Sequence, residues 1–374
     1  MRPSLSILSI ISLAFWLAAS SSTVFATERV DALIEQARQE QWSADHLFEY
    51  LRLDEGSDEC RIFADSVALQ ERHARWREAV FLLAAIDADA LDDWFVGRST
   101  PPRAVQREVS MQLHCMITAL VDAAIDTPYK IRIFRDMPNR FQGRFRDAPA
   151  LAQAARQNPR WYELTANAVT RSVERNIHSQ AHIWHRKFVF SGRNFNRITD
   201  EAALDCGFPA GSTWRPQNHA HRRCWEQTLS AQEREREILS ASAAPGLSRH
   251  HWGTDVDILG LNPVHFREGG AHHGDWQWLD DQALDFGFFQ PYQGQPPERR
   301  AHMEERWHWS YFPIAQALWD FAAHQQDHIE EVLNESWDHF ERRWGALRGP
   351  YFDHMRQYWR DYLFNIYVPP VPPS

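Results

Sequence analysis

The sequence is short of positive charge, and it contains neither an internal repeat nor a coiled-coil pattern. Over 374 residues, 40 lysines and arginines face 50 aspartates and glutamates, which gives a formal net charge of −10 at pH 7. Because a nucleic-acid-binding surface needs clustered cations to neutralise phosphates, this balance argues against nucleic acid as a partner. The length is sufficient to bury a substantial core, either as two domains or as one domain with large additions.

Long apolar runs are also absent, except at the N-terminus. Arg2 is followed by an apolar run from Leu5 to Ala18 and then by mostly small residues up to Ala26. This order predicts a secretory signal peptide at residues 1–26, since the run is too short to span a membrane comfortably. An uncleaved N-terminal anchor is the alternative. Cleavage removes Arg2, takes the formal net charge from −10 to −11, and leaves no transmembrane segment in the expected mature chain.

Cysteine is scarce, with only Cys60, Cys115, Cys206 and Cys224. An exported chain meets oxidising surroundings in which thiols tend to pair, and four cysteines permit three connectivities. We favour Cys206 with Cys224, because the segment between them is rich in Gly, Pro and Asn and indicates a surface loop that a short disulfide would hold. Cys60 with Cys115 then remains. The alternative is that some of the four are buried free thiols.

Hydrophobic periodicity predicts an N-terminal region built of helices. Apolar residues recur at spacings of three and four over residues 71–95 and again over 105–124, so each segment has one apolar stripe. His, Cys, Asp and Glu show no ligand spacing in this region. We therefore predict that residues 27–180 form a helical N-terminal module that serves as a scaffold or positions substrate.

Strands are expected only in the central region, residues 181–315, which we predict to be the catalytic core. Short apolar or alternating runs predict strands at residues 187–191, 254–258 and 306–311. Helix-forming segments predict helices at residues 225–241, 278–286, 315–343 and 351–367. Residues 316–374 are expected to form C-terminal helices that end in a Pro-rich tail.

Two motifs in the central region carry the candidate chemistry. The first runs from Ser248 to Asp257 and contains His250, and the second places Glu305 three residues before His308. His250, Asp257 and His308 offer nitrogen, oxygen and nitrogen donors, a set that suits an open zinc site with a place for water. Glu305 is then placed to act as general base. Because 19 histidines make isolated pairs of this kind common by chance, only the two motifs together indicate a metal site.

The two motifs resemble the signature of a known family. The pattern is Ser248-x-His250-x-x-Gly253-x-x-x-Asp257 followed by Glu305-x-Trp307-His308. It is similar to that of the D-alanyl-D-alanine carboxypeptidase family of zinc peptidases, which includes the vancomycin-resistance D,D-carboxypeptidases and D,D-dipeptidases. The resemblance covers residues 183–313. It implies that His250, Asp257 and His308 are the zinc ligands and that Glu305 is the catalytic base.

The resemblance also implies two residues that bind substrate. Arg193 matches the family arginine that holds substrate near the reacting bond, where a guanidinium would clamp a terminal carboxylate or stabilise the developing oxyanion. A structural salt bridge is the alternative role for Arg193. Ser248 matches the family serine, which implies contact with substrate.

The chain departs from the family pattern at Asp255, where the family often has alanine. On a strand, Asp255 and Asp257 point to the same face, so either carboxylate could reach the metal. The spacing from His250 favours Asp257 as the ligand, and Asp255 is then expected to orient a histidine. His251 is expected to point away from the metal. His272 and His273 lie in a Gly-rich loop and are expected at the surface.

These observations together predict a fold and a function. The fold class is α+β, with a small, mostly antiparallel sheet that carries a zinc site and with helical additions at both ends. The resemblance implies a bacterial, periplasmic or secreted zinc D,D-carboxypeptidase that acts on the D-Ala-D-Ala bond of peptidoglycan stem peptides. The first alternative is a peptidoglycan endopeptidase of the same fold. The second is a non-catalytic, zinc-containing wall-binding protein, which Glu305 argues against because a structural metal site needs no base.

Overall fold

The computed structural model describes residues 23–53, 55, 59–63, 65–123, 175–191, 197–258, 260–294, 302–345 and 350–370, without the side chains of residues 23–29, 118, 121 and 122. Most of the predicted signal peptide and the predicted substrate residue Arg193 lie outside the described residues. In the part of the chain that is described, no helix combines the length and the apolar character that crossing a bilayer requires.

The described part of the N-terminal region, up to residue 123, is helical, as its periodicity predicts. It contains α2 (Thr23–Gln39), α3 (Ala44–Tyr50), α4 (Ser66–Ile86), α5 (Ala88–Phe95) and α6 (Arg103–Ala123). The apolar segment at residues 71–95 is divided between α4 and α5 because Asp87 ends the first helix and its side chain accepts a hydrogen bond from Ala90 N as the cap of the second.

The sheet is small and antiparallel, which confirms the predicted fold class. Its strands are β1 (Asp255–Asp257), β2 (Phe288–Phe289) and β3 (His308–Tyr311), in the order β1-β3-β2. The register pairs Asp257 with His308 and Asp255 with Ser310. Directly opposed residues on neighbouring strands have their side chains close together. The first and second sequence motifs therefore meet across the β1–β3 pair.

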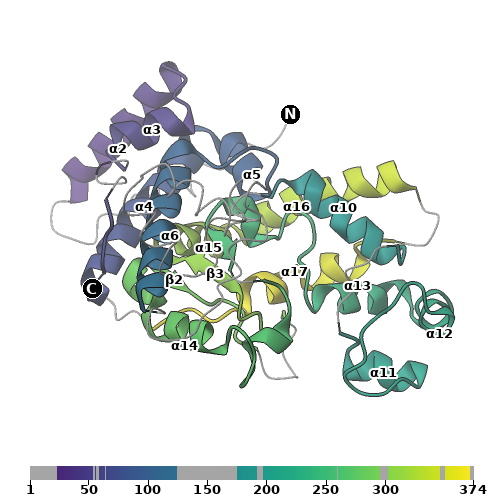
Figure 1. Ribbon diagram of the computed structural model, residues 1–374. Helices are drawn as coiled ribbons and strands as arrows, with labels where there is room; N and C mark the ends of the chain where they lie inside the picture. Colours follow the sequence, from purple (N-terminus) through teal and green to yellow (C-terminus); the bar gives the residue numbers. More distant parts are fainter. Residues whose placement is uncertain are drawn as a thin grey trace, which may run out of the picture.

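The remaining elements are helices or helical turns. They are α10 (Ile177–Phe188), α11 (Asp200–Cys206), α12 (His219–Arg223), η3 (Cys224–Thr228), α13 (Ala231–Leu239), η4 (Arg249–Trp252), η5 (Pro263–Phe266), α14 (His273–Gln282), η6 (Ala283–Phe286), α15 (Phe312–His324), α16 (Gln326–Trp344) and α17 (Asp353–Phe364). Figure 1 shows α11 and α12 well to one side of the sheet. The predicted helix at residues 315–343 is thus two helices, α15 and α16, which meet at Gln325.

The predicted strand at residues 187–191 is wrong, because α10 extends to Phe188. Buried Ile177, Ala181, Trp184 and Phe188 follow one another at spacings of four, three and four, which is the period of a helix face. The apolar run that suggested a strand is the end of that face, followed by Phe190 at a φ of 52°. A short apolar run does not distinguish a strand from the last turn of a buried helix.

The N-terminal helices, the central region and the C-terminal helices contribute to one hydrophobic core. Figure 1 shows α4 and α6 beside α15 and the sheet. Two tryptophans join α5 to the first site motif: Trp94 Nε1 donates to the carbonyl of Trp252, and Trp252 Nε1 donates to the carbonyl of Phe95, each at 3.1 Å. The N-terminal region therefore supports the loop that carries His250, while the predicted module boundaries stay a prediction.

A buried glutamate in α6 connects the N-terminal helices to β3. The side chain of Glu108 accepts hydrogen bonds from Arg72, from Trp76 Nε1 at 3.0 Å and from the Tyr311 hydroxyl at 2.7 Å. Arg72 and Glu108 are 4% and 1% exposed, so their charges are removed from water together. Removing one partner of such a buried pair strongly destabilises a protein, so Glu108 holds the N-terminal helices and β3 together.

The cysteines form Cys60–Cys115 and Cys206–Cys224 disulfides, which confirms the predicted pairing and leaves none of the four as a free thiol. Cys206–Cys224 joins the end of α11 to η3. Cys60–Cys115 fastens the segment before α4 to α6.

We predict that the buried carboxyl group of Glu235, in α13, makes the free energy of unfolding depend on pH. Its carboxylate accepts the His354 and Met355 backbone N–H groups at the start of α17, each at 3.1 Å. Burial raises the pKa of Glu235 from about 4.5 to about 8. The folded protein therefore holds this proton more tightly than the unfolded chain. We expect its contribution to stability to be present below about pH 4.5 and to be lost as the pH rises to about 8.

Denaturant titrations at several pH values measure this effect. The Glu235→Gln variant, which has no proton to lose, should show a smaller fall in the free energy of unfolding between pH 5 and 8 than the wild type. The exposed Glu331→Gln in α16 is the matched control and should follow the wild type. Parallel curves for wild type and Glu235→Gln would contradict the prediction.

Candidate metal centre

The structure brings His250, Asp257 and His308 together. His250 lies on the helical turn η4, Asp257 ends β1 and His308 begins β3. One ligand atom from each lies within 4.8 Å of the others. Their side chains are 5%, 11% and 4% exposed, so the group is enclosed and its most accessible member is the carboxylate.

Two of the donor spacings in this group are close to those around a small tetrahedral cation. His250 Nε2 lies 3.4 Å from Asp257 Oδ2, and His308 Nδ1 lies 3.1 Å from Asp257 Oδ1. Zinc bonds to nitrogen and oxygen of about 2.0–2.1 Å at tetrahedral angles place neighbouring ligand atoms about 3.4 Å apart. Two histidines and one carboxylate are a donor set that zinc accepts, and they leave a fourth position open.

The charges of the group favour a bound cation. Burial alone would raise the pKa of Asp257, but the charge and hydrogen bond of His250, together with those of His308, hold it well below its usual range. Burial lowers the pKa of His250, which favours its neutral form. For His308, burial is outweighed by hydrogen bonds to Asp255 and Asp257, which raise its pKa to about 9. A metal that takes the lone pair of His308 would replace that proton.

Asp255 faces the ring nitrogens of His250 and His308 that point away from Asp257. Its Oδ1 accepts a hydrogen bond of 2.9 Å from His308 Nε2, the ring nitrogen that faces away from Asp257. Its backbone carbonyl accepts one of 3.0 Å from His250 Nδ1. The carboxylate that joins the two histidine nitrogens of the candidate metal group is therefore that of Asp257.

Glu305 lies beside the candidate metal group. Its Oε2 is 3.7 Å from His308 Nδ1, and its side chain is 12% exposed. The backbone holds it there: Glu305 N donates to the carbonyl of Tyr292 at 2.9 Å, and His308 N donates to the carbonyl of Glu305 at 3.0 Å. Burial raises the pKa of Glu305 to about 7, with the charge of His308 acting in the opposite direction. The carboxyl group can thus both accept and donate a proton near neutral pH.

Two cations near the group, Arg175 and Lys187, lie outside both sequence motifs. Arg175 Nη2 lies 3.9 Å from Asp257 Oδ2, and the Arg175 backbone N–H donates to the carbonyl of His250 at 3.2 Å. Burial lowers the pKa of Lys187 to about 8, while the charge of Glu305 raises it. Arg175 lies before α10 in a stretch without a motif, and Lys187 was assigned to a strand. Neither had a spacing signal that could have identified it.

The other predicted residues have mixed outcomes. Ser248 is buried and precedes η4, two residues before His250, and its contact with substrate stays a prediction. His251 points elsewhere as expected, since its Nδ1 donates to the carbonyl of Arg175 and its Nε2 accepts from Gly246 N. The surface position expected for His272 is wrong. It is fully buried against Phe266 at the start of α14 because the glycine-rich loop folds back on itself.

Gly253 ends η4 and allows the chain to approach Pro101 closely. Its φ is +73°, and a Cβ here would lie 2.6 Å from Pro101 Cγ. Gly207 has a similar φ of +68° with nothing within 4 Å of a Cβ. We expect Gly207→Ala to cost about 1 kcal/mol of unfolding free energy for the left-handed backbone, and Gly253→Ala to cost at least about 2 kcal/mol because the clash is added. Equal costs in denaturant titrations would contradict the clash.

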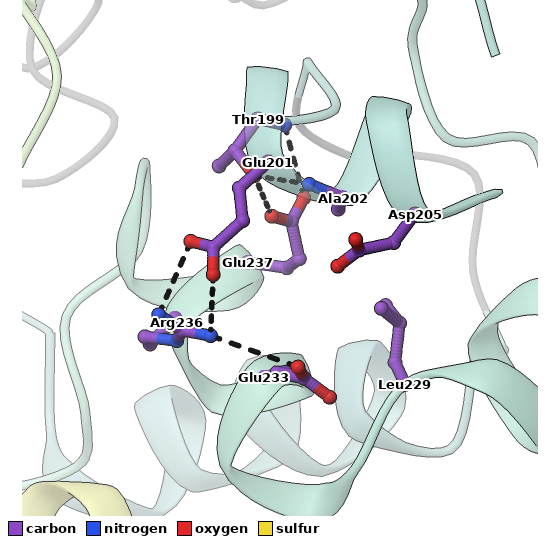
Figure 2. Close-up of a pocket in the computed structure, with 8 residues that line it drawn as sticks. All are labelled: Thr199, Glu201, Ala202, Asp205, Leu229, Glu233, Arg236 and Glu237. Atoms are coloured by element: carbon purple, nitrogen blue, oxygen red, sulfur yellow. Dashed lines mark hydrogen bonds and ion pairs between the residues drawn. The ribbon is translucent and has the colours of Figure 1, made fainter. Parts of the chain in front are cut away.

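A surface pocket between α11 and α13 contains none of the predicted site residues. Figure 2 shows its lining residues Thr199, Glu201, Ala202, Asp205, Leu229, Glu233, Arg236 and Glu237. Arg236 pairs with Glu201 at 3.1 Å and lies 3.8 Å from Glu233. The positive charge of Arg236 thus offsets part of the acidic charge in this pocket. The pocket is separate from the candidate metal centre.

Three converging donors with a carboxylate beside them are typical of metal-dependent hydrolases. Comparison with known proteins agrees with this class: the family model of VanY, D-alanyl-D-alanine carboxypeptidase, matches residues 150–314. The chain belongs to the D-alanyl-D-alanine carboxypeptidase family, as the two motifs predicted. A Haemophilus influenzae protein described as uncharacterized is 30% identical over 101 residues, which are 24% of this chain and 72% of the relative. No solved structure matches the chain.

Proposed function

We propose that this protein is an exported, zinc-dependent D,D-carboxypeptidase that releases the terminal D-alanine from peptidoglycan stem peptides. The proposal is carried by one observation: His250, Asp257 and His308 converge with Glu305 beside them, inside the segment that matches the carboxypeptidase family. We assign the first three as zinc ligands, because their donor types and spacing fit that ion.

Glu305 is the proposed general base. Zinc at this position would supply a Lewis acid for the scissile carbonyl and would make a bound water more acidic. The Glu305 carboxylate is 3.7 Å from His308 Nδ1, close enough to the ligand group to take a proton from a water molecule held there. The oxygen of that water forms a bond to the carbonyl carbon, the C–N bond breaks, and the same carboxyl group donates the proton to the leaving amine.

Cationic residues are proposed to receive the anionic end of the substrate. Arg193 is assigned this role by its match to the family arginine. Arg175 adds a second guanidinium next to Asp257, and Lys187 adds an amine whose charge interacts with Glu305. A stem peptide that ends in a free carboxylate complements this charge. Ser248 is proposed to contact the same substrate.

Export is proposed from two features of the chain. Residues 1–26 have the order of regions expected of a signal peptide. The Cys60–Cys115 and Cys206–Cys224 disulfides suit an oxidising compartment, either the periplasm or the exterior.

The decisive experiment is mass spectrometry of defined stem peptides incubated with the protein, with and without a metal chelator. We expect release of free D-alanine from a peptide that ends in D-Ala-D-Ala, and we expect the chelator to abolish it. A peptide with a blocked C-terminus should be resistant. Cleavage of the blocked peptide or within a cross-link would instead establish an endopeptidase. Stoichiometric zinc without any cleavage would establish the non-catalytic alternative.

A further inference from the structure

Asp255 contacts both histidines of the candidate metal group, one through its backbone and the other through its side chain. Its backbone carbonyl accepts a hydrogen bond from His250 Nδ1 at 3.0 Å, and its carboxylate accepts one from His308 Nε2 at 2.9 Å. A backbone carbonyl oxygen can only accept hydrogen bonds, and so can the oxygens of an ionised carboxylate. The ring nitrogen that faces Asp255 must therefore carry the hydrogen in each histidine.

The opposite ring nitrogens face Asp257. His250 Nε2 lies 3.4 Å from Asp257 Oδ2, and His308 Nδ1 lies 3.1 Å from Asp257 Oδ1. A histidine binds a metal through a nitrogen lone pair, and a hydrogen bond at the other nitrogen decides which one is available. The contacts with Asp255 thus make His250 Nε2 and His308 Nδ1 the nitrogens that can bind a cation.

The Asp255 carboxylate is itself held by a fully buried set of partners. Oδ1 accepts from Arg249 Nε at 2.9 Å, and Oδ2 accepts from the hydroxyls of Thr254 at 2.6 Å and Ser310 at 3.0 Å. Arg249 Nη2 donates to the same Ser310 hydroxyl at 2.6 Å. Asp255 and Ser310 are 0% exposed and Arg249 is 2% exposed, so the carboxylate has a counter-charge and no access to bulk water.

Packing also holds the side chain of Arg249, the cation of this pair, in place. The Arg249 guanidinium lies over the ring of Trp252, with its carbon 4.6 Å from the ring centroid. Trp252 is anchored to α5 through the carbonyl of Phe95. Moving an ion pair this completely out of water costs desolvation free energy, which offsets much of the attraction between the charges. Stability alone is therefore a weak reason for such a pair. A function at the histidines explains why the charges are placed here.

We propose that the Arg249–Asp255 pair is a positioning device for the metal centre. Its carboxylate presets the metal-binding nitrogen of His308, and the negative charge beside His308 Nε2 makes His308 a stronger donor at Nδ1. The backbone carbonyl of Asp255 presets the nitrogen of His250. The inference rests on the zinc site of the proposed function. The alanine that the family often has at this position could not provide the carboxylate, so the device belongs to this chain and to relatives that share the pair.

Zinc affinity of the full mature chain, measured by competition with a chelating dye, tests the charge. The Asp255→Asn side chain keeps an oxygen that can accept from His308 and loses the negative charge. We expect zinc affinity to fall about 10- to 100-fold, the usual cost of removing such a partner. The matched control is the exposed Asp281→Asn in α14, which should bind zinc as the wild type does. Wild-type affinity in Asp255→Asn would overturn the role of the charge.

A second variant separates positioning from loss of folding. Arg249→Leu with Asp255→Ala removes both charges, so that neither is left buried alone. We expect this double variant to unfold cooperatively in chelator and to bind zinc at least about 10-fold more weakly than the wild type. If it is folded and binds zinc as tightly as the wild type, the proposal is overturned.

Nitrogen-15 NMR of the histidines in the zinc-loaded wild type decides the geometry without any variant. We expect zinc at Nδ1 of His308 and Nε2 of His250, with the hydrogen retained on the other nitrogen of each ring. Coordination through His308 Nε2 would overturn the proposal even if both variants failed to fold. Because no measurement here involves cleavage, an inactive protein that passes these tests would refute the proposed peptidase function and leave this inference standing.

Discussion

Replacing Glu305 with alanine is expected to lower kcat for D-alanine release by about 100- to 10,000-fold, the range for loss of a general base. Zinc content should not change, because the carboxylate lies beside the ligand group and is not one of its three donors. Steady-state kinetics on a D-Ala-D-Ala stem peptide measures the loss, and metal analysis of the same preparation measures the zinc.

The neighbouring Glu304 supplies the matched control for this substitution. Its side chain is 42% exposed and pairs with Arg306, so Glu304→Gln removes a carboxylate from the same segment without touching the candidate metal centre. We expect nearly wild-type kcat in this variant. Comparable turnover in Glu305→Ala and in the wild type would refute the assignment of Glu305 as the base.

Replacing His308 with alanine is expected to abolish stoichiometric zinc binding and, with it, activity. The substitution removes one of the three donors and leaves His250 and Asp257 as a two-donor site. It also removes the ring nitrogen Nε2, which donates a hydrogen bond to the buried carboxylate of Asp255. Metal analysis after dialysis measures the zinc, and thermal unfolding in chelator shows whether the variant is folded.

His273→Ala is the control for this second substitution. His273 lies at the start of α14, is only partly buried and is not among the three donors. It should retain both zinc and activity. His308→Ala that contained no zinc but cleaved substrate at the wild-type rate would show that the group is not the catalytic metal centre.

Much of the candidate centre was predictable because its residues are close together in two short motifs. His250 and Asp257 are separated by a tight turn at Gly253, and the alternation of the following residues indicated a strand. The Glu305 and His308 pair could be recognised only together with the first motif, because isolated pairs of this spacing are common by chance. Alternate residues of one strand share a face, so either Asp255 or Asp257 could reach the metal, and only the spacing from His250 favoured Asp257. The structure adds the reason for the difference, since Asp257 opposes His308 across the sheet and Asp255 pairs with the buried Arg249.

Two expectations from the sequence are wrong for physical reasons. The apolar run at residues 187–191 predicts a strand, but such a short run is equally compatible with the last turn of a buried helix. His272 was placed at the surface from the glycines beside it, although the chain folds back and buries the ring against Phe266. Arg175 was not considered because its approach to Asp257 depends on a backbone contact with His250, and no local pattern encodes such a contact.

The sequence by itself determined the family, the helical periods and the three donors, because those depend on residue types at fixed short separations. Only the tertiary structure decided how the donors meet. It placed β1 against β3 so that Asp257 opposes His308, and it fastened the turn of His250 to the N-terminal helices through Trp94 and Trp252. It also gave the two aspartates different partners. These are contacts between segments distant in the chain, and they form only when the common core is packed.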